Sequence, residues 1–508
     1  MAGRAVPVIP GGAAGALVVG LTLGTLAAVA LRADGPAALG PADWAAVRFT
    51  LVQAVLSAVL SVALAIPVAR ALARRRFPGR QALVTLMGAP FVLPVIVAIL
   101  GLLAVFGRGG IVNQALAALE LPPISIYGLH GVVLAHVFFN LPLCVRLLLQ
   151  GWSDIPAERF RLAASLGMGP GEIRRQLETP MLRAVVPGAL AVVFLICMTS
   201  FAVALTLGGG PRATTVELAI YQAFRFDFDL GRAALLGGLQ MALTVAAGLL
   251  ALWFARTPAF GAGLDRPPQR WDAAPGWDWV WIALAALFLL VPMAMVAIRG
   301  AEGIARLEAG VWSALAQSLA VALAATVLTL TLAVPLAIGA RRVRGLDVVG
   351  YLPIAASALV LGTGLFILLF PFVDPGQLTL PVTALVNALL ALPFAVRVLR
   401  PAVDTIEAAH GRLADSLGLT GWSRVRWLLL PRLRPALGFA AGLSAALAMG
   451  DLGVVTLFAP PDGGTLPLYI FRLMGSFQME AAGGAAVILL AASLALFLTF
   501  DRWGRAGA

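Results

Sequence analysis

Long apolar stretches, each with enough residues to cross a membrane as a helix, recur along the whole chain. They lie near residues 12–32, 49–70, 82–106, 128–150, 184–206, 233–255, 278–298, 312–339, 349–371, 379–400, 435–457 and 480–500. A hydrocarbon core about 30 Å thick requires roughly 20 apolar residues per helix. Because 61% of the 508 residues are hydrophobic and only 12% are charged, a water-soluble fold could not bury this surface. We predict an all-α integral membrane protein with about 12 transmembrane helices, the first of them an uncleaved helix rather than a signal peptide.

Two nearly identical heptads repeat at a constant offset of about half the chain. They are Arg161-Leu-Ala-Ala-Ser-Leu-Gly167 and Arg412-Leu-Ala-Asp-Ser-Leu-Gly418, and each is followed at the same distance by a proline, Pro180 or Pro431. Self-similarity at a fixed spacing indicates an internal duplication. Gly101 and Gly364 are a further matching pair outside the heptads. We therefore expect two six-helix repeats.

A polar segment separates the two predicted repeats. Residues 256–277 are rich in proline and glycine and carry charges of both signs, which is typical of a linker. The expected domains are therefore 1–255 and 278–508, joined by the linker 256–277. With six helices in each domain, the second enters the membrane in the same sense as the first, so the repeats are expected to be parallel.

Arginines indicate how the chain is oriented. The clusters Arg74–Arg76 and Arg341–Arg344 and both heptads fall on one side of the predicted helices, whereas the intervening loops carry few arginines. By the positive-inside rule, that side is cytoplasmic and includes both termini. The basic residues lie mainly between apolar stretches, so the formal charge of +12 indicates membrane topology and we expect no nucleic-acid partner.

Several kinds of catalytic or metal site are not expected. The sequence contains no lysine, which excludes a Walker A phosphate loop, since that motif requires one. Cys144 and Cys197 lie in apolar stretches, and the three histidines show no spacing typical of metal ligands. We expect no metal site and no catalytic residue, and any use of ATP would require a separate subunit.

The heptads predict a short helix on the cytoplasmic face. An alanine-rich helix should end at Gly167 in a left-handed cap, exposing the small side chains of Ala163 and Ala164, and a second turn should run to Pro180, which stops the helix. One such loop could be an interfacial helix whose arginines contact anionic lipid headgroups. Two copies at equivalent positions favour a docking element for a two-fold partner.

This pattern resembles the cytoplasmic loop of the inner-membrane permeases of binding-protein-dependent ABC importers. That loop carries Glu-Ala-Ala, three residues, Gly, nine residues and Ile-x-Leu-Pro, and the glycine, aliphatic residue and proline coincide twice in this chain. Arginine replaces the family's glutamate in both loops, so a salt bridge made by that glutamate cannot be transferred. The resemblance implies that the ATPase-coupling residues are Arg161, Ala163, Ala164, Gly167, Leu177, Pro180, Arg412, Ala414, Gly418, Leu428 and Pro431.

The resemblance also implies partners and cargo. We expect a permease of the bacterial inner membrane that binds two copies of an ABC ATPase subunit, which hold the ATP, and a periplasmic substrate-binding protein. Residues 200–221 look most like the thiamine branch of the family, whereas 451–457 and 465–471 are similar to both thiamine and iron(III) permeases. Thiamine or its phosphates are the expected cargo, with iron(III) as the alternative. A secondary transporter is the rival class, but it needs coupling-ion carboxylates and the chain offers little beyond Asp451.

Polar residues inside the apolar stretches are candidates for a transport pathway. A carboxylate costs roughly 2.5–3.5 kcal/mol at a helix centre, so Asp451 should face the pathway, or else cap a helix broken at Gly450. We take Phe201 as its counterpart in the first repeat. His136 and Asn140 share a helix face and His136 aligns with Asn387, which suits hydrogen bonds between helices or a pathway. Tyr221, Phe224 and Phe226 in an outer loop could meet a binding protein or anchor at the interface. The candidate pathway residues are His136, Asn140, Ser200, Phe201, Asn387 and Asp451.

Overall fold

The computed structural model describes residues 9–31, 38–87, 93–210, 213–254, 272, 276–343, 345–356, 358–369, 371–373, 375–459 and 463–506. Within these ranges the regular structure is entirely helical. Eleven helices are long and apolar enough to cross a membrane, or twelve if the bent pair Gly345–Pro353 and Ala358–Leu369 counts as one span. The prediction of an all-α, multi-pass membrane protein is confirmed.

Within the described residues, the first half contains helices α1 to α12. They are α1 (Ile9–Leu31), α2 (Pro41–Arg74), α3 (Arg80–Leu86), α4 (Val95–Phe106), α5 (Ile111–Ala118), α6 (Leu129–Ser153), α7 (Ala157–Ser165), α8 (Pro170–Ile173), α9 (Thr179–Met198), α10 (Ala202–Leu207), α11 (Val216–Arg225) and α12 (Leu230–Phe254). A π-helical turn, Arg174–Glu178, joins α8 to α9.

The second half follows a similar order. Its helices are α13 (Trp277–Gly303), α14 (Gly310–Gly339), α15 (Gly345–Ala355), α16 (Ala358–Leu369), α17 (Pro375–Ser416), α18 (Gly421–Arg424), α19 (Leu430–Met449), α20 (Gly453–Phe458), α21 (Leu466–Gly475) and α22 (Met479–Arg505). A second π-helical turn, Val425–Leu429, joins α18 to α19. A 3-10 turn, Ile304–Arg306, extends α13.

Two apolar stretches that the sequence presents as single helices are interrupted. The stretch 184–206 divides into α9 and α10, and 435–457 divides into α19 and α20. Each break leaves three residues between the helices, 199–201 in the first half and 450–452 in the second. A hydropathy pattern cannot show such a break, because the residues on both sides of it remain apolar.

The first helix of each half packs against the other half. Helix α1 contacts α14, α15 and α16, and α13 contacts α2 and α4. Gly101 of α4 lies so close to α13 that a Cβ there would be 2.6 Å from the carbonyl oxygen of Pro292. Gly364 of α16 lies equally close to α1, where a Cβ would be 2.3 Å from the carbonyl oxygen of Thr25. The matching glycines of the sequence therefore serve the same kind of contact between the halves.

Most of the predicted linker, residues 256–271 and 273–275, lies outside the described residues. Asp272 is described and is buried, with its Oδ2 atom 3.1 Å from Nη2 of Arg74 at the end of α2. Asp278 in the first turn of α13 also pairs with Arg75, at 3.3 Å. These ion pairs fasten the start of the second half to the end of α2.

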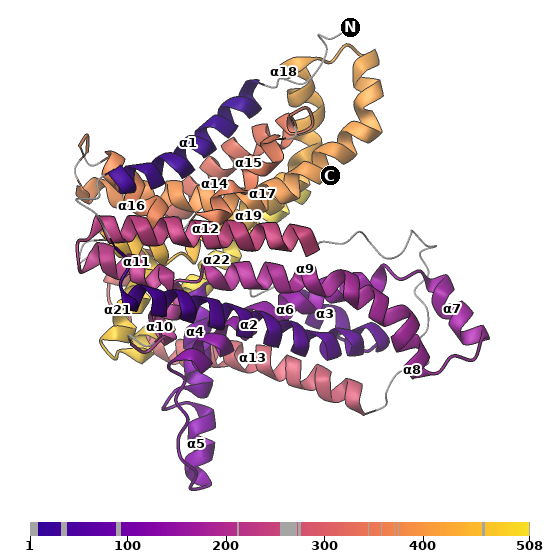
Figure 1. Ribbon diagram of the computed structural model, residues 1–508, viewed down its shortest axis with the longest axis horizontal. Coiled ribbons are helices and arrows are strands. Elements are labelled where there is room, and N and C mark those ends of the chain that lie inside the picture. Colours follow the sequence, from indigo (N-terminus) through magenta and orange to yellow (C-terminus); the bar gives the residue numbers. More distant parts are fainter. Residues whose placement is uncertain are drawn as a thin grey trace.

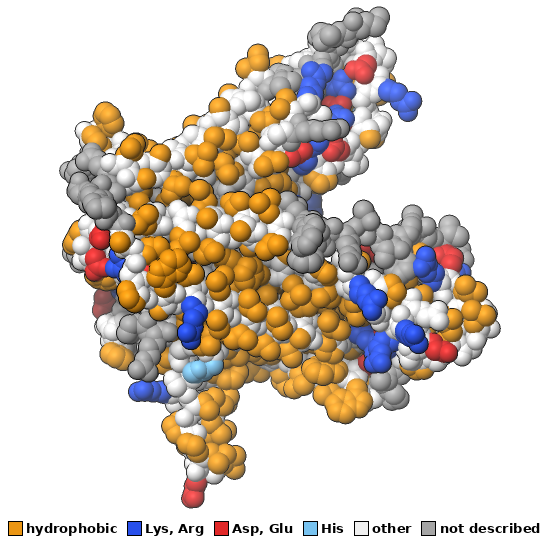
Figure 2. All heavy atoms as spheres, in the orientation of Figure 1, with side chains coloured by type: hydrophobic (Ala, Val, Ile, Leu, Met, Phe, Trp, Pro, Cys, Tyr) orange, Lys and Arg blue, Asp and Glu red, His pale blue; other side chains and the backbone are white. Residues whose placement is uncertain are grey.

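The molecule divides into two arms that diverge at one end (Figure 1). Helices α7, α8 and α18 lie at that end, as does the N-terminal end of α1. Figure 2 shows hydrophobic side chains over most of this face, with arginines and acidic residues gathered on the tips of the arms and a hollow between them. Charged side chains also lie at the opposite end of the molecule, so polar groups bound the apolar body at both ends, as expected for a membrane-spanning protein.

Candidate functional site: two loops and two broken helices

Both heptads end in the same backbone conformation. Gly167 has φ of +66° and Gly418 has φ of +67°. The N–H of Met168 donates to the carbonyl of Ala163 at 3.0 Å, and the N–H of Leu419 donates to that of Ala414 at 2.9 Å. This six-to-one hydrogen bond around a left-handed residue is a Schellman cap, for which glycine is the favoured residue. The predicted glycine caps are confirmed.

The prolines after the heptads do not stop a helix, so that part of the prediction is wrong. Residues Pro170–Met198 form one continuous helix, and Pro180 lies in the first turn of α9. In the π-helical turn before it, the N–H of Thr179 donates to the carbonyl of Arg174. Pro431 follows the other π-helical turn in the same way. A wider turn accommodates the proline ring, which would otherwise clash with a carbonyl of the preceding turn.

Leucines, rather than alanines, form the exposed face of the two heptads. Ala163 and Ala414 are both only 2% exposed, so the expectation that Ala163 faces a partner is wrong, although Ala164 is exposed. The exposed fractions of the leucines are 60% for Leu162, 62% for Leu166, 58% for Leu413 and 67% for Leu417. Leu177 and Leu428 are buried beneath the loops. Each heptad therefore presents two leucines one turn apart, a pattern suited to a partner's apolar pocket.

Arginines at the family's glutamate position are exposed in both loops. Arg161 forms an ion pair with Glu158 on its own helix, at 3.1 Å, and both side chains are largely exposed. Arg412 is also exposed. Both arginines therefore lie on the surface of their loops.

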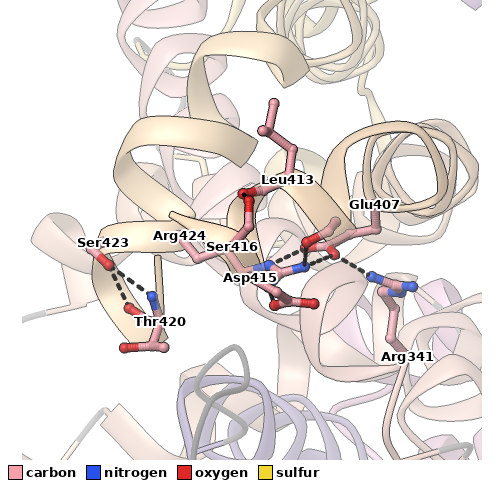
Figure 3. Close-up of polar contacts among 9 residues, drawn as sticks. Arg341, Glu407, Leu413, Asp415, Ser416, Thr420, Ser423 and Arg424 are labelled. Carbon is pink, nitrogen blue, oxygen red and sulfur yellow. Dashed lines mark hydrogen bonds and ion pairs between the residues drawn. The ribbon is translucent and has the colours of Figure 1, made fainter. Parts of the chain in front are cut away.

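Charged anchors that the sequence analysis missed hold the second loop in place. Arg424 of α18 donates from Nε and Nη2 to Glu407 of α17, at 3.0 and 2.5 Å, and its Nη1 atom pairs with Asp415 at 2.5 Å (Figure 3). Arg341 approaches the same Glu407 at 3.1 Å. Arg424 and Glu407 are buried. The signal in the sequence was the appearance of charge at positions where the first repeat is apolar.

The first loop has a different anchor. Glu178, in the π-helical turn, is 1% exposed and pairs with Arg70 of α2 at 2.7 Å. The indole N–H of Trp152 in α6 donates to the same carboxylate at 3.3 Å. The two loops therefore have the same backbone conformation at their caps, but different side chains attach them to the membrane body.

The breaks in α9–α10 and α19–α20 have matching backbones. The N–H of Ser200 donates to the carbonyl of Cys197, and that of Asp451 donates to the carbonyl of Ala448, both at 3.4 Å. Asp451 therefore corresponds to Ser200, and not to Phe201 as the sequence suggested. The second half therefore has a carboxylate where the first half has a serine hydroxyl.

Asp451 caps the helix that follows it. Its Oδ1 atom accepts a hydrogen bond from the N–H of Gly453, the first residue of α20, at 3.1 Å, which confirms the predicted cap. Its Oδ2 atom is buried without a hydrogen-bond partner among the described residues, and the same holds for Nδ2 of Asn387.

His136 and Asn140 lie between helices. The Nδ1 atom of His136 is 3.2 Å from the hydroxyl of Ser57 in α2, and Asn140 donates to Sγ of Cys197 in α9 at 3.4 Å. The prediction of hydrogen bonds between helices is confirmed for both. Two glutamines escaped the sequence analysis: Gln53 donates to the carbonyl of Cys197 and Gln240 to that of Met198, each at 2.8 Å. Both glutamines therefore hydrogen-bond to backbone carbonyls at the end of α9, next to the first break.

Aromatic rings lead from the outer surface to the first break. Tyr221 and Phe224 belong to α11, not to a loop as predicted. The ring of Tyr221 lies 5.6 Å from that of Phe226, which is 65% exposed, and 5.4 Å from that of Phe201. Phe224 contacts Phe458 of the second half, with ring centroids 5.5 Å apart. Burial raises the pKa of the Tyr221 phenol, so the ring is neutral at physiological pH.

Metal-ligating residues are dispersed. Throughout the ranges that the structure describes, no group of three or more His, Cys, Asp or Glu side chains is placed to hold a metal ion. Cys144 and Cys197 are buried free thiols.

Comparison with known proteins identifies relatives along the full chain. No family model matches. The thiamine transport system permease protein of Brucella abortus is 40% identical over 522 aligned positions, which cover 99% of this chain and 96% of the relative. That of Escherichia coli is 40% identical over 90% of this chain and 89% of its own length, and that of Haemophilus influenzae is 32% identical over 87% and 86%. The chain belongs to the family of thiamine transport system permeases.

Proposed function

We propose that this chain is the membrane-spanning permease of an ATP-driven importer that carries thiamine or its phosphates across the bacterial inner membrane. The observation that carries the proposal is the full-length similarity to thiamine transport system permeases. It is supported by two loops at one end of the molecule whose glycine caps have the same backbone conformation. Orientation follows the arginines: the loops and both termini are cytoplasmic, and Tyr221 and Phe226 face the periplasm.

Two copies of an ATPase subunit dock under the two loops. The contacts come from Leu162 and Leu166 on one side and Leu413 and Leu417 on the other, next to Arg161 and Arg412. Gly167, Gly418, Pro180 and Pro431 shape the loops, and Ala163, Ala414, Leu177 and Leu428 pack them against the body. ATP is bound by the ATPase subunits, and a periplasmic binding protein delivers the cargo.

The repeats 1–255 and 278–508 are parallel and move relative to each other. Three features recur in both halves and support this: the heptad loop, the broken helix, and a first helix (α1 or α13) that packs against the other half. The arms also diverge at the proposed cytoplasmic end (Figure 1). Closure of the ATPase subunits would bring the arms together and open the path on the opposite side.

The test is reconstitution of the permease with its ATPase and binding protein in proteoliposomes. We expect uptake of labelled thiamine that requires ATP, and a binding protein that prefers thiamine to iron(III). Uptake driven by a proton gradient without the ATPase would instead indicate a secondary transporter. A binding protein specific for iron(III) would refute the cargo assignment.

A further inference from the structure

We propose that Asp451 and the ring of Phe201 form a binding site for an aromatic cation where the two broken helices meet. The inference rests on the proposed function and goes further by naming the residues that recognise the charge of the cargo. It concerns residues of both halves, so the site would change as the arms move.

Residues from the two breaks approach the same glycine, Gly453, the first residue of α20. Gly453 follows Asp451, and a Cβ placed on it would lie 3.4 Å from Oδ1 of Asp451 and 3.8 Å from Cδ1 of Phe201. The carboxylate of the second half and the aromatic ring of the first half are therefore neighbours around one glycine. A larger residue than glycine would come between them.

Asp451 lacks a partner for its charge. The cap to Gly453 uses Oδ1 only, while Oδ2 is buried and makes no hydrogen bond to any residue that the structure describes. A buried, half-satisfied carboxylate inside a membrane span is costly unless a cation or a donor meets it. The side chain of Asn387 interacts with the same carboxylate, but it is a neutral donor and supplies no positive charge. A helix cap alone would not need a charge, because asparagine caps equally well.

The aromatic side chains that lead to the break also suit an aromatic cation. Phe226, Tyr221 and Phe201 form a row of ring contacts from an exposed position to the break. Aromatic faces attract cations and stack with flat rings. Thiamine combines a neutral aminopyrimidine ring with a permanently charged thiazolium ring, so its two rings match an aromatic row that ends at a carboxylate.

The experiment compares variants in the reconstituted complex of permease, ATPase and binding protein. Asp451→Asn keeps an Oδ1 acceptor for Gly453 and removes only the charge. We expect it to lower thiamine uptake by about tenfold or more, equivalent to about 1.4 kcal/mol, while ATPase stimulation by the loaded binding protein is retained. Phe201→Leu should also lower uptake, and Phe201→Tyr should restore it. As a matched control, Thr456→Val removes a hydrogen bond of 2.6 Å within α20 without changing charge, and should leave uptake within about twofold of wild type.

A second measurement starts from the wild-type complex, so its first outcome does not depend on a variant folding. The wild-type complex should prefer thiamine to an analogue in which a neutral thiophene replaces the thiazolium ring, and Asp451→Asn should reduce that preference. Absence of the preference in wild type would overturn the inference, as would normal thiamine uptake by Asp451→Asn. Loss of ATPase stimulation together with lower thermal stability would show that Asp451 is only structural. If wild type carries no thiamine at all, the proposed function itself fails.

Discussion

Arg424 and Glu407 form a buried, two-point ion pair that joins the second motif loop to α17, with nitrogen–oxygen distances of 3.0 and 2.5 Å. At the equivalent positions of the first half stand Ile173, which is fully buried, and Pro156. Proline ends α6 near its heptad and makes α7 a separate helix, since it lacks an N–H. Glutamate lets α17 continue for 42 residues through the second heptad. This pair of positions therefore anchors the second loop and decides whether each heptad forms a separate helix, while the first loop is anchored by Glu178 instead.

Removing Arg424 should destabilise the second loop. Arg424→Ala leaves Glu407 buried with only Arg341, so we expect a loss of about 3 kcal/mol, the low end for breaking a buried ion pair. The double variant Arg424→Ile with Glu407→Leu should recover most of this loss, since an apolar pair carries no desolvation penalty. Thermal unfolding of the purified permease in detergent measures the effect. Arg161→Ala, which breaks an exposed pair, is the control and should cost less than about 1 kcal/mol.

Gly167 and Gly418 should tolerate asparagine better than alanine. A Cβ at either position meets nothing within 4 Å, so the cost of Gly→Ala comes from the left-handed backbone and is about 1–2 kcal/mol. Asparagine adopts this conformation more readily. We expect Gly167→Ala and Gly418→Ala to reduce coupling of ATP hydrolysis to transport, and the asparagine variants to retain more of it. Gly171→Ala, also in open space but without a positive φ, is the control, and an equal loss there would contradict the explanation.

Sequence patterns predicted those parts of the fold that depend on solvent and on backbone chemistry. Apolar length located the spans, and glycine at the end of each heptad predicted a left-handed cap that both loops adopt. The prediction that Pro180 stops the helix is wrong because the effect of a proline depends on the preceding turn. The π-helical turn that accommodates Pro180 has no sequence signature. Ala163 was assigned to the wrong face because the side on which the helix packs is set by tertiary contacts.

Polar anchors were harder to predict than the spans. Gln53 and Gln240 stand alone in apolar stretches, and their role depends on a break in another helix that hydropathy does not reveal. Arg424 and Glu407 are separated by a cap and a turn, so their contact follows only once Gly418 has reversed the chain. Such contacts between distant residues are properties of the folded loop, whereas the glycine cap is local.

The exposed leucines should carry the affinity for the ATPase subunit. Leu162→Ser with Leu166→Ser removes two side chains that each contribute roughly 1.5–3 kcal/mol when fully buried, so binding should weaken by at least about tenfold per leucine. Leu413→Ser with Leu417→Ser should act alike at the other loop. Pull-down or calorimetric titration with the ATPase measures this. Leu119→Ser alters a leucine that is 68% exposed next to α5 on the opposite side, and a similar loss there would contradict docking at the heptads.

Gly101 and Gly364 should be intolerant of any side chain, because each allows a helix of one half to touch the first helix of the other. A Cβ on Gly101 would come within 2.6 Å of the Pro292 carbonyl oxygen, and one on Gly364 within 2.3 Å of the Thr25 carbonyl oxygen. Backbone atoms cannot move aside cheaply, so we expect Gly101→Ala and Gly364→Ala each to cost about 1–3 kcal/mol through overpacking. Gly24→Ala in α1 provides the control: no atom lies within 4 Å of its Cβ position, and alanine favours a helix over glycine by about 1 kcal/mol. The thermal midpoint should therefore fall for Gly101→Ala and Gly364→Ala and stay level or rise for Gly24→Ala. Equal thermal midpoints for the three variants would mean that α1 and α13 do not pack closely against the other half in the membrane.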